Sequence, residues 1–377
     1  MSSEAPNPTG DRALAPEAGA WRGTPRPWLA DLILLAIAML VPIVDVASGG
    51  LGLIAPAKSI FIFAIVALGL NVVTGFTGLL HLGIAAFMAI GVYAFAILTN
   101  ESYPFRLSFW PALFLTLPIG AIAGFVLGSP TLGLRGDYLA IVTLGFGEIV
   151  QDVLRNVETV TQGTQGINPV AKPFVPWFVA AEDGTRTFAW TRISVAGDLA
   201  WYILLLLILI GVVVFVRNLE RSRIGRAWMS VREDELASKA MGIPPVRTKM
   251  SAFATGAALA AFAGGLWAST LDSTGEPANY DFQVSILALC IVIVGGMGSV
   301  TGVLVGAVVM VGANDIVLDR LTQFIQQQKL VSDANVLGSP NNWKYMLFGL
   351  ALVFMMRFKP DGLVSRKGSG SRTGGRA

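Results

Sequence analysis

The chain has 377 residues, of which 54% are hydrophobic and 14% charged, and its formal net charge is only +3. A soluble domain carries about 25% charged residues, so this composition excludes an ordinary soluble protein. With one cysteine and one histidine, Cys290 and His81, the chain also excludes an internal disulfide, a cysteine metal site and a multi-histidine metal centre.

The N-terminal residues 1–27 are polar and rich in Pro, Gly and Ala. A secretory signal peptide has its apolar core much nearer the start, so we expect a disordered cytoplasmic tail here. Residues 364–377 are rich in Gly, Ser and Arg, and we expect a second disordered, basic tail. The segment between them, residues 28–363, is predicted to be one transmembrane domain.

Apolar segments recur throughout residues 28–363. An apolar helix needs about 20 residues to cross the hydrocarbon core of a bilayer. We therefore predict an all-α polytopic membrane protein with about ten transmembrane or re-entrant helices. The predicted helices cover residues 28–46, 58–74, 79–98, 108–128, 136–154, 199–217, 250–271, 282–297, 300–318 and 343–357.

Two glycine-rich junctions leave the exact number of spans open. The first is Gly75-Phe-Thr-Gly78, and the second is Gly295-Gly-Met-Gly-Ser299. Each is either a tight turn between two spans or a break inside one re-entrant segment. A break is tolerated in the membrane only where protein or water satisfies the backbone groups.

The distribution of Lys and Arg predicts the orientation, because short cytoplasmic loops collect these residues. Eight of them lie in the 217–249 segment and six in residues 357–376, whereas residues 272–281 contain none. With ten spans, both termini and the 217–249 loop are predicted to be cytoplasmic. The long 155–198 loop is then predicted to be periplasmic.

Within the 217–249 loop, residues 233–241 are predicted to form a short helix. Acidic residues at its start suit the helix dipole, Glu235 and Lys239 are spaced as an i,i+4 pair, and Gly242 can end the helix. Its apolar residues would share one face. That face must be buried against the chain's own membrane domain, against the lipid interface or against a partner.

This loop resembles the EAA loop of ABC importer permeases, and the resemblance is closest to the branched-chain amino acid permease family of the LivM type. In that family a coupling helix sits in a groove of a cytoplasmic ATPase. Leu236 stands where the general motif has its first alanine. The resemblance implies that the residues coupled to the ATPase are Arg232, Glu233, Asp234, Glu235, Leu236, Ala237, Met241 and Gly242.

Three further segments resemble the same family: residues 71–93, residues 133–149, and the glycine run at 294–302. His81 replaces the family's usual serine, and Ile84 replaces a common histidine.

Because an ionisable group inside the membrane usually faces protein or water, Glu148 is a candidate for the translocation pathway. The alternative is that Glu148 is a residue of the outer interface. For His81 the alternative is helix packing, and for the glycines it is a turn or helix break. The candidate pathway residues are Asn71, Gly75, Gly78, His81, Thr143, Glu148, Gly295 and Gly296.

The resemblance implies a permease in the bacterial inner membrane that imports leucine, isoleucine and valine. Its expected partners are membrane lipid, a sister permease, two cytoplasmic ATP-binding subunits and a periplasmic substrate-binding protein, with no nucleic acid and no cofactor. The chain lacks a Gly-x-x-x-x-Gly-Lys-Ser/Thr loop, so it is not expected to be an enzyme.

Three alternatives remain at this point. A permease of the same superfamily could carry urea, amides or other amino acids. A secondary transporter would need acidic residues in paired broken helices, and Glu148 is a single acid without an inverted partner. An intramembrane enzyme is disfavoured because His81 has no acid or nucleophile with which to form a catalytic set.

Overall fold

A computed structural model of the chain describes residues 34, 36–42, 45, 52–131, 137–180, 186–193, 197–327 and 343–364. The predicted tail 1–27, nearly all of the tail 364–377 and part of the predicted helix 28–46 lie outside these residues.

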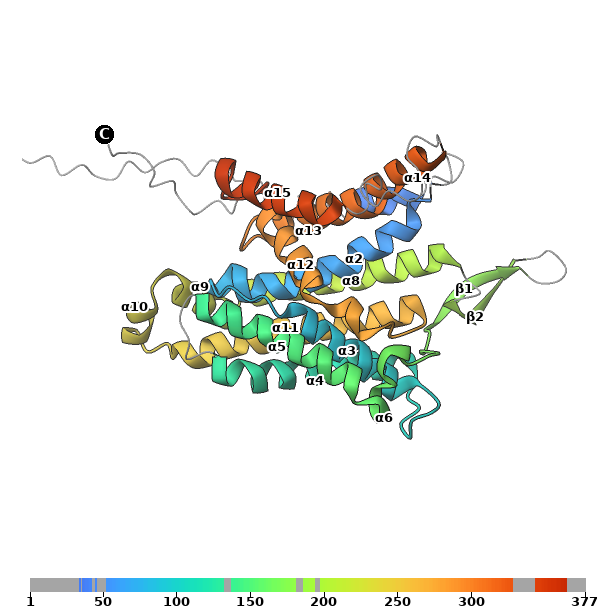
Figure 1. Cartoon of the computed structure of the whole chain (residues 1–377), viewed down its shortest axis with the longest axis horizontal. Coiled ribbons are helices and arrows are strands. Elements are labelled where there is room, and N and C mark those ends of the chain that lie inside the picture. Colours follow the sequence, from blue (N-terminus) through green and yellow to red (C-terminus); the bar gives the residue numbers. More distant parts are fainter. Residues whose placement is uncertain are drawn as a thin grey trace, which may run out of the picture.

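The described residues form a bundle of long helices that run between two opposite ends of the molecule (Figure 1). We call these the α10 end and the hairpin end, after the elements that protrude there. The long helices are α2 (Ile54–Leu70), α3 (Ile84–Thr99), α4 (Phe109–Thr131), α5 (Asp137–Asn156), α8 (Asp198–Arg221), α11 (Pro245–Leu271), α12 (Phe282–Gly295), α13 (Val300–Gly312) and α15 (Lys344–Phe358). Short elements are η1 (Asn71–Gly75), α6 (Glu158–Thr161), η2 (Gly163–Gln165), α9 (Arg223–Glu233), α10 (Glu235–Ala240), η3 (Pro277–Tyr280), η4 (Ala313–Leu318) and α14 (Asp319–Gln327).

Among the described residues, six helical segments are long and apolar enough to cross a membrane, and two shorter apolar helices accompany them. The helical, multi-span architecture is therefore confirmed, whereas the predicted count of about ten spans is not. One reason is α5, which forms where a span was predicted but is too rich in charged residues to qualify, with Asp137, Glu148, Asp152 and Arg155.

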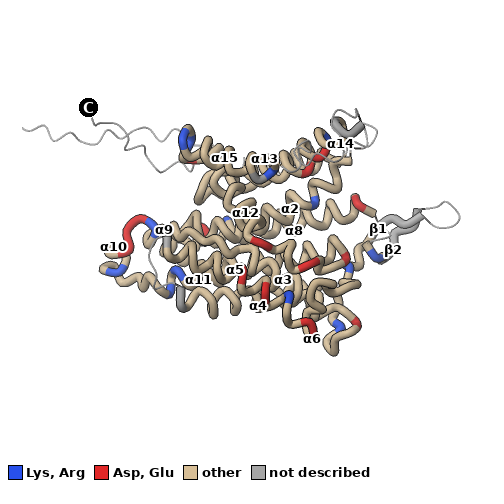
Figure 2. Tube along the Cα trace, viewed as in Figure 1, with Lys and Arg blue, Asp and Glu red and all other residues tan. Residues whose placement is uncertain are grey.

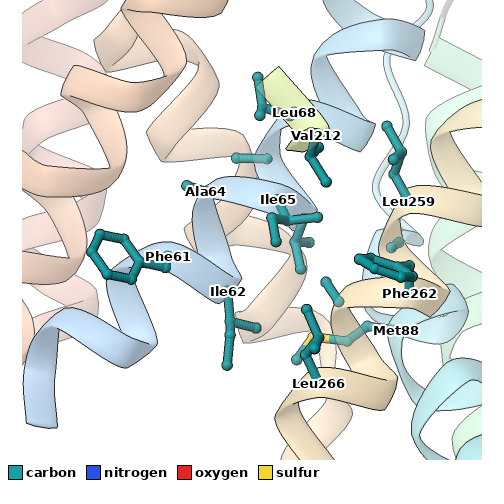
Figure 3. Close-up of a cluster of buried hydrophobic side chains, with 14 of the residues drawn as sticks. Phe61, Ile62, Ala64, Ile65, Leu68, Met88, Val212, Leu259, Phe262 and Leu266 are labelled. Atoms are coloured by element: carbon teal, nitrogen blue, oxygen red, sulfur yellow. The ribbon is translucent and has the colours of Figure 1, made fainter. Parts of the chain in front are cut away.

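Helix α2 is the most deeply buried of the six segments. Its apolar side chains meet those of α3, α8 and α11 in a continuous cluster, which includes Ile65 and Leu68 of α2, Met88 of α3 and Leu266 of α11 (Figure 3). Because lipid tails are as apolar as these side chains, burial alone does not hold helices together in a membrane, and close packing has to contribute.

Small residues bring the backbones of α2, α4 and α11 into direct contact. A Cβ atom built on Gly69 would lie 2.8 Å from the carbonyl oxygen of Gly256, and one built on Gly256 would lie 2.7 Å from that of Gly69. On α4, a Cβ at Gly124 would come within 2.5 Å of the Ala257 side chain. These glycines therefore act as packing residues, as their position inside apolar runs indicates.

Both glycine-rich junctions are turns between helices that run in opposite directions (Figure 1). Residues 76–83 connect η1 to α3, and Gly78 adopts a positive φ of 72°. Residues 296–299 connect α12 to α13, with φ values of 123° at Gly296 and 84° at Gly298. Such angles are available to glycine at little cost, which explains the residue type at these positions.

One element was not predicted. Within the 155–198 segment, β1 (Phe174–Ala180) and β2 (Arg186–Arg192) form an antiparallel pair in which Val175 lies opposite Thr191. Both strands are rich in aromatic and β-branched residues, which favour a pleated conformation. The sequence predicts only a loop for this segment, so the hairpin is an addition to it, and strands remain a small part of the helical fold.

Candidate functional site

The predicted 233–241 helix is divided by Asp234. Helix α9 ends at Glu233, Asp234 is extended with a φ of −155°, and α10 begins at Glu235. The Asp234 carboxylate accepts hydrogen bonds from the backbone N–H groups of Leu236 (2.8 Å) and Ala237 (2.9 Å). Asp234 is therefore the N-cap of α10, a role for which aspartate is well suited, and not a residue of the helix itself.

The apolar face of α10 does not pack on its own chain. Leu236 is 80% exposed and Met241 is 82% exposed, and charged residues lie along and beside α10 (Figure 2). The residue that α10 turns inward is Ser238, whose hydroxyl lies 2.7 Å from that of Ser230 in α9. Large apolar side chains exposed together on a protruding helix are typical of an interaction surface.

Trp228 and Glu235 attach α9 and α10, respectively, to the bundle. Trp228 of α9 is completely buried, stacks on Phe76 and donates its indole N–H to the Thr248 carbonyl (3.0 Å) of α11. Glu235 of α10 pairs with Lys249 of α11 at 2.6 Å. The predicted partner of Glu235 was Lys239; the described residues show no ion pair between these two side chains, because the α11 lysine takes the position.

Arg232, in the last turn of α9, reaches the first glycine-rich turn. Its guanidinium donates a hydrogen bond to the carbonyl oxygen of Gly75. The same side chain passes beside Gly78, where an added Cβ would lie 3.1 Å from the Arg232 Cγ. It also passes beside Gly298 of the second turn, where an added Cβ would lie 3.0 Å from Nη1.

The two turns also contact each other directly. The side-chain oxygen of Asn71 accepts a hydrogen bond of 2.8 Å from the backbone N–H of Gly298. Asn71 is fully buried, and its amide nitrogen has no hydrogen-bond partner among the described residues. We call the set of Asn71, Gly75, Gly78, Gly298 and the Arg232 side chain the glycine junction.

The chain that follows α15 closes the second turn. Leu363 donates its backbone N–H to the Val294 carbonyl (2.8 Å), and Val364 donates to the Gly295 carbonyl (3.0 Å). A Cβ on Gly296 would lie 2.7 Å from the Val364 carbonyl oxygen. The structure therefore brings Gly295 and Gly296 beside the glycine junction, at the end of α12, where they form backbone contacts.

His81 and Thr143 lie farther inside the bundle, where α3 begins. His81 is 1% exposed, lies 4.7 Å from the Phe253 ring, and neither ring nitrogen has a hydrogen-bond partner in the described part of the chain. Thr143 of α5 accepts a hydrogen bond from the Leu82 N–H (3.1 Å) and donates to the Ala140 carbonyl (3.0 Å). Thr143 therefore holds the start of α3 against α5, whereas His81 packs against Phe253 of α11.

Glu148 lies apart from the other predicted site residues. It belongs to an exposed face of α5 that also carries Tyr138, Ile141, Ile149 and Asp152. A face that mixes two carboxylates with large apolar side chains suits neither lipid alone nor bulk water alone. Charged side chains at membrane depth usually face protein or a water-filled cavity.

The structure also shows a cavity of about 340 Å³ at the hairpin end, between α2, α12, η4 and α15. Its walls combine apolar residues such as Phe63 and Trp267 with the charged residues Asp281, Asp315 and Lys344. Charges of both signs beside apolar walls could hold a small zwitterion. The sequence alone did not point to this site; its signal is Asp315, an acidic residue inside the predicted span 300–318.

Comparison with known proteins identifies a family for this chain. The family described as "Branched-chain amino acid transport system / permease component" matches residues 53–356. The high-affinity branched-chain amino acid transport system permease protein LivM of Salmonella typhimurium is 36% identical over 342 residues, covering 88% of this chain and 74% of that protein. The Escherichia coli protein of the same name is 38% identical over 311 residues, covering 80% and 68%.

A probable branched-chain amino acid transport permease protein LivM of Methanocaldococcus jannaschii is 28% identical over 261 residues, covering 68% of this chain and 69% of that protein. No solved structure matches the chain.

Proposed function

The chain belongs to the family of branched-chain amino acid transport permeases, and from this membership we propose that it is a translocation subunit of an ABC importer for leucine, isoleucine and valine. It is a permease component of a transport system, with apolar helices that cross the membrane several times. In this proposal two cytoplasmic ATPases drive transport, a periplasmic binding protein delivers the substrate, and a sister permease completes the pathway.

The observation that carries the proposal is the exposed apolar face of α10. Leu236 and Met241 project from the end of the bundle and contact none of the described helices closely enough to be buried. Burying a large apolar side chain contributes about 1.5–3 kcal/mol, so a partner groove that covers both would gain a substantial free energy of binding. The proposed occupant of this face is the ATPase.

The charge distribution supports a cytoplasmic location for the α10 end. Short cytoplasmic segments of membrane proteins are enriched in Lys and Arg. The described basic residues of the segments that form this end are Arg217, Arg221, Arg223, Arg226, Arg232, Lys239, Arg247, Lys249, Arg357 and Lys359. Helix α15 ends here too, since residues 363 and 364 bond to the end of α12.

The exposed face of α5 supports a shared pathway with a sister permease. Glu148 and Asp152 would be costly against lipid, so a second subunit on this face explains both the acids and the apolar residues between them. Helix α5 would then form one wall of a cavity that lies between the two permeases. Closing of the ATPases would displace α10 and switch this cavity between outward and inward access.

The proposal is tested by reconstituting the permeases and ATPases in proteoliposomes and adding the binding protein. We expect leucine uptake that requires ATP and the binding protein and that other apolar amino acids inhibit. Uptake of urea but not leucine would contradict the substrate while leaving an ABC permease. Leucine uptake driven by a proton or sodium gradient without ATPases would contradict both.

Docking is tested separately with Leu236→Asp and Met241→Asp. Each places a carboxylate on the exposed face of α10 without disturbing a buried contact, so membrane insertion should persist while copurification of the ATPases falls. Leu236→Met keeps the face apolar and is the matched control. Equal ATPase recovery with all three variants would show that α10 is not the docking element.

A further inference from the structure

Arg232 lies between α10, the proposed docking element, and the two glycine turns at the end of the bundle. It lies in the last turn of α9, and only Glu233 and Asp234 separate it from the start of α10. The connection between the two helices is short and tied by the contact of Ser230 with Ser238. A displacement of α10 therefore moves the end of α9, and the Arg232 backbone with it.

The Arg232 side chain connects this element to both glycine turns. It donates to the Gly75 carbonyl and lies alongside Gly78 and Gly298. Any side chain at these two glycines would crowd it, because added Cβ atoms would lie only 3.1 and 3.0 Å from its atoms. The absence of side chains at Gly78 and Gly298 thus leaves room for the partly exposed Arg232 side chain, which extends from α9 to both turns.

The glycine junction also contains a buried hydrogen-bond donor, the Asn71 side-chain NH₂ group, that has no partner among the described residues. The Asn71 carboxamide holds Gly298 through its oxygen. A buried donor without a partner is unfavourable. A second arrangement of the two turns, in which this NH₂ group finds an acceptor, would therefore compete with the arrangement described.

From these contacts we infer that Arg232 is a positioning residue which transmits displacement of α10 to both glycine turns, and so links ATPase closure to the ends of α2 and α12. The inference rests on the proposed function, because it takes the partner of α10 to be the ATPase. It assigns to Arg232 a role inside the permease, distinct from the direct ATPase contact that the loop resemblance implies.

The first test compares Arg232→Ala with Arg226→Ala in the reconstituted complex. Arg226 lies on the same helix but donates to the Arg221 carbonyl at 2.7 Å, away from the junction. For Arg232→Ala we expect normal copurification of the ATPases and ATP hydrolysis within about twofold of the parent, but at least a tenfold loss of leucine uptake. Arg226→Ala should keep both activities.

Two results of this comparison would overturn the inference. Loss of ATPase copurification with Arg232→Ala would make the arginine a docking contact. Uptake that stays proportional to hydrolysis would show that the two turns move without it. Arg232→Lys is the conservative variant. We expect it to retain more uptake than Arg232→Ala, because the lysine ammonium can donate to the Gly75 carbonyl. It should not reach the parent level, because lysine lacks the second arm of the guanidinium, which extends toward Gly298.

The second test does not depend on the substrate. Met297, in the second turn, is 42% exposed, and Met297→Cys provides a thiol there, with the parent chain and its buried Cys290 as the blank. Labelling by a maleimide should change at least threefold between nucleotide-free and ATP-trapped complexes, and this change should disappear with Arg232→Ala.

The outcomes separate the inference from the proposal on which it rests. Failure of the parent chain to copurify ATPases contradicts the proposed function. If ATPases copurify and the nucleotide-dependent labelling change persists with Arg232→Ala, only the inference fails.

Discussion

Gly75 occupies a position where no side chain fits. An added Cβ would lie 2.6 Å from the backbone nitrogen of Gly298 and closer still to the Asn71 oxygen. We predict that Gly75→Ala lowers the stability of the purified protein by about 1–3 kcal/mol, the usual cost of overpacking a well-packed interior. The measurement is the midpoint of thermal unfolding in detergent.

The matched control is Gly211→Ala in α8, where an added Cβ meets no atom within 4 Å. Alanine favours a helix over glycine, so the midpoint should stay or rise slightly there. Equal midpoints for both variants would show that the two turns are not in contact in the folded protein.

The glycine junction also shows how far single residues could be predicted. The residue type was informative, because clustered glycines in apolar sequence indicate a turn or a close approach. Their convergence was not predictable, since Gly75 lies 157 residues from Arg232 and Asn71 lies 227 residues from Gly298. Arg232 was assigned to the ATPase-facing loop, and only the three-dimensional arrangement shows that its guanidinium points to the chain's own turns.

At the scale of elements, α10 depends on its cap. Asp234→Ala removes both side-chain hydrogen bonds to Leu236 and Ala237, which costs about 1 kcal/mol for a typical N-cap. For a helix of six residues this loss should fray the first turn and lower uptake severalfold, with little effect on membrane insertion. Uptake by the reconstituted complex measures it.

Asp234→Asn keeps a carboxamide oxygen that can cap the same N–H groups, and it should retain most of the uptake. If Asn and Ala lower uptake equally, the charge of Asp234 matters and the cap does not.

The ion pair between Glu235 and Lys249 gives a second prediction at this scale. Glu235→Lys places two cations together where the structure has a pair at 2.6 Å, and it also puts a cation at the positive end of α10. We expect uptake to fall while insertion persists. In the double variant Glu235→Lys with Lys249→Glu, the pair is restored with reversed charges.

The reversed pair should recover part of the uptake, measured with the same complex. Recovery will be incomplete, because the cation at the helix start remains and exposed pairs are worth only about 0–1 kcal/mol. An unchanged rate with Glu235→Lys alone would show that this contact does not position α10.

Local sequence signals predicted the existence of the short helix in the 217–249 loop more accurately than its boundaries. Gly242 was expected to end the helix, and its φ of 83° shows why it can, whereas Asp234 was assigned to the helix although its side chain caps it. The partner of Glu235 comes from 14 residues away, which helix spacing could not show. The hairpin was not predicted because β1 and β2 are only seven residues each, much shorter than the apolar runs that indicate membrane spans.

At the scale of the whole molecule, the central prediction is topology. Reporter domains fused after Arg232 and after Arg186 should report opposite sides of the membrane, cytoplasmic for the first and periplasmic for the second. The physical reason is the concentration of Lys and Arg at the α10 end. Enzymatic activity of a reporter that works only in the periplasm is the measurement.

A periplasmic signal after Arg232 would reverse the orientation and remove the proposed ATPase contact. The same signal at both positions would instead show that the number of spans between them is wrong.

The number of spans was hard to predict because single-chain hydropathy assumes that each helix faces lipid. Helix α5 has an exposed face with Glu148 and Asp152, so its composition is less apolar than that of the six candidate spans. The helical class follows from composition and run length, whereas the count depends on short or charged helices such as α3 and α5, which run length alone does not classify.

Helix α11 is the least apolar of the six candidate spans, although it is among the most buried. Eight alanines and three glycines among its 27 residues allow the backbones of α2 and α4 to approach it closely. A helix of this kind partitions weakly into lipid on its own, so during synthesis it must enter the bilayer against neighbours that have already been inserted. The order of the chain provides these neighbours, because α2, α3 and α4 precede α11 and are synthesised before it.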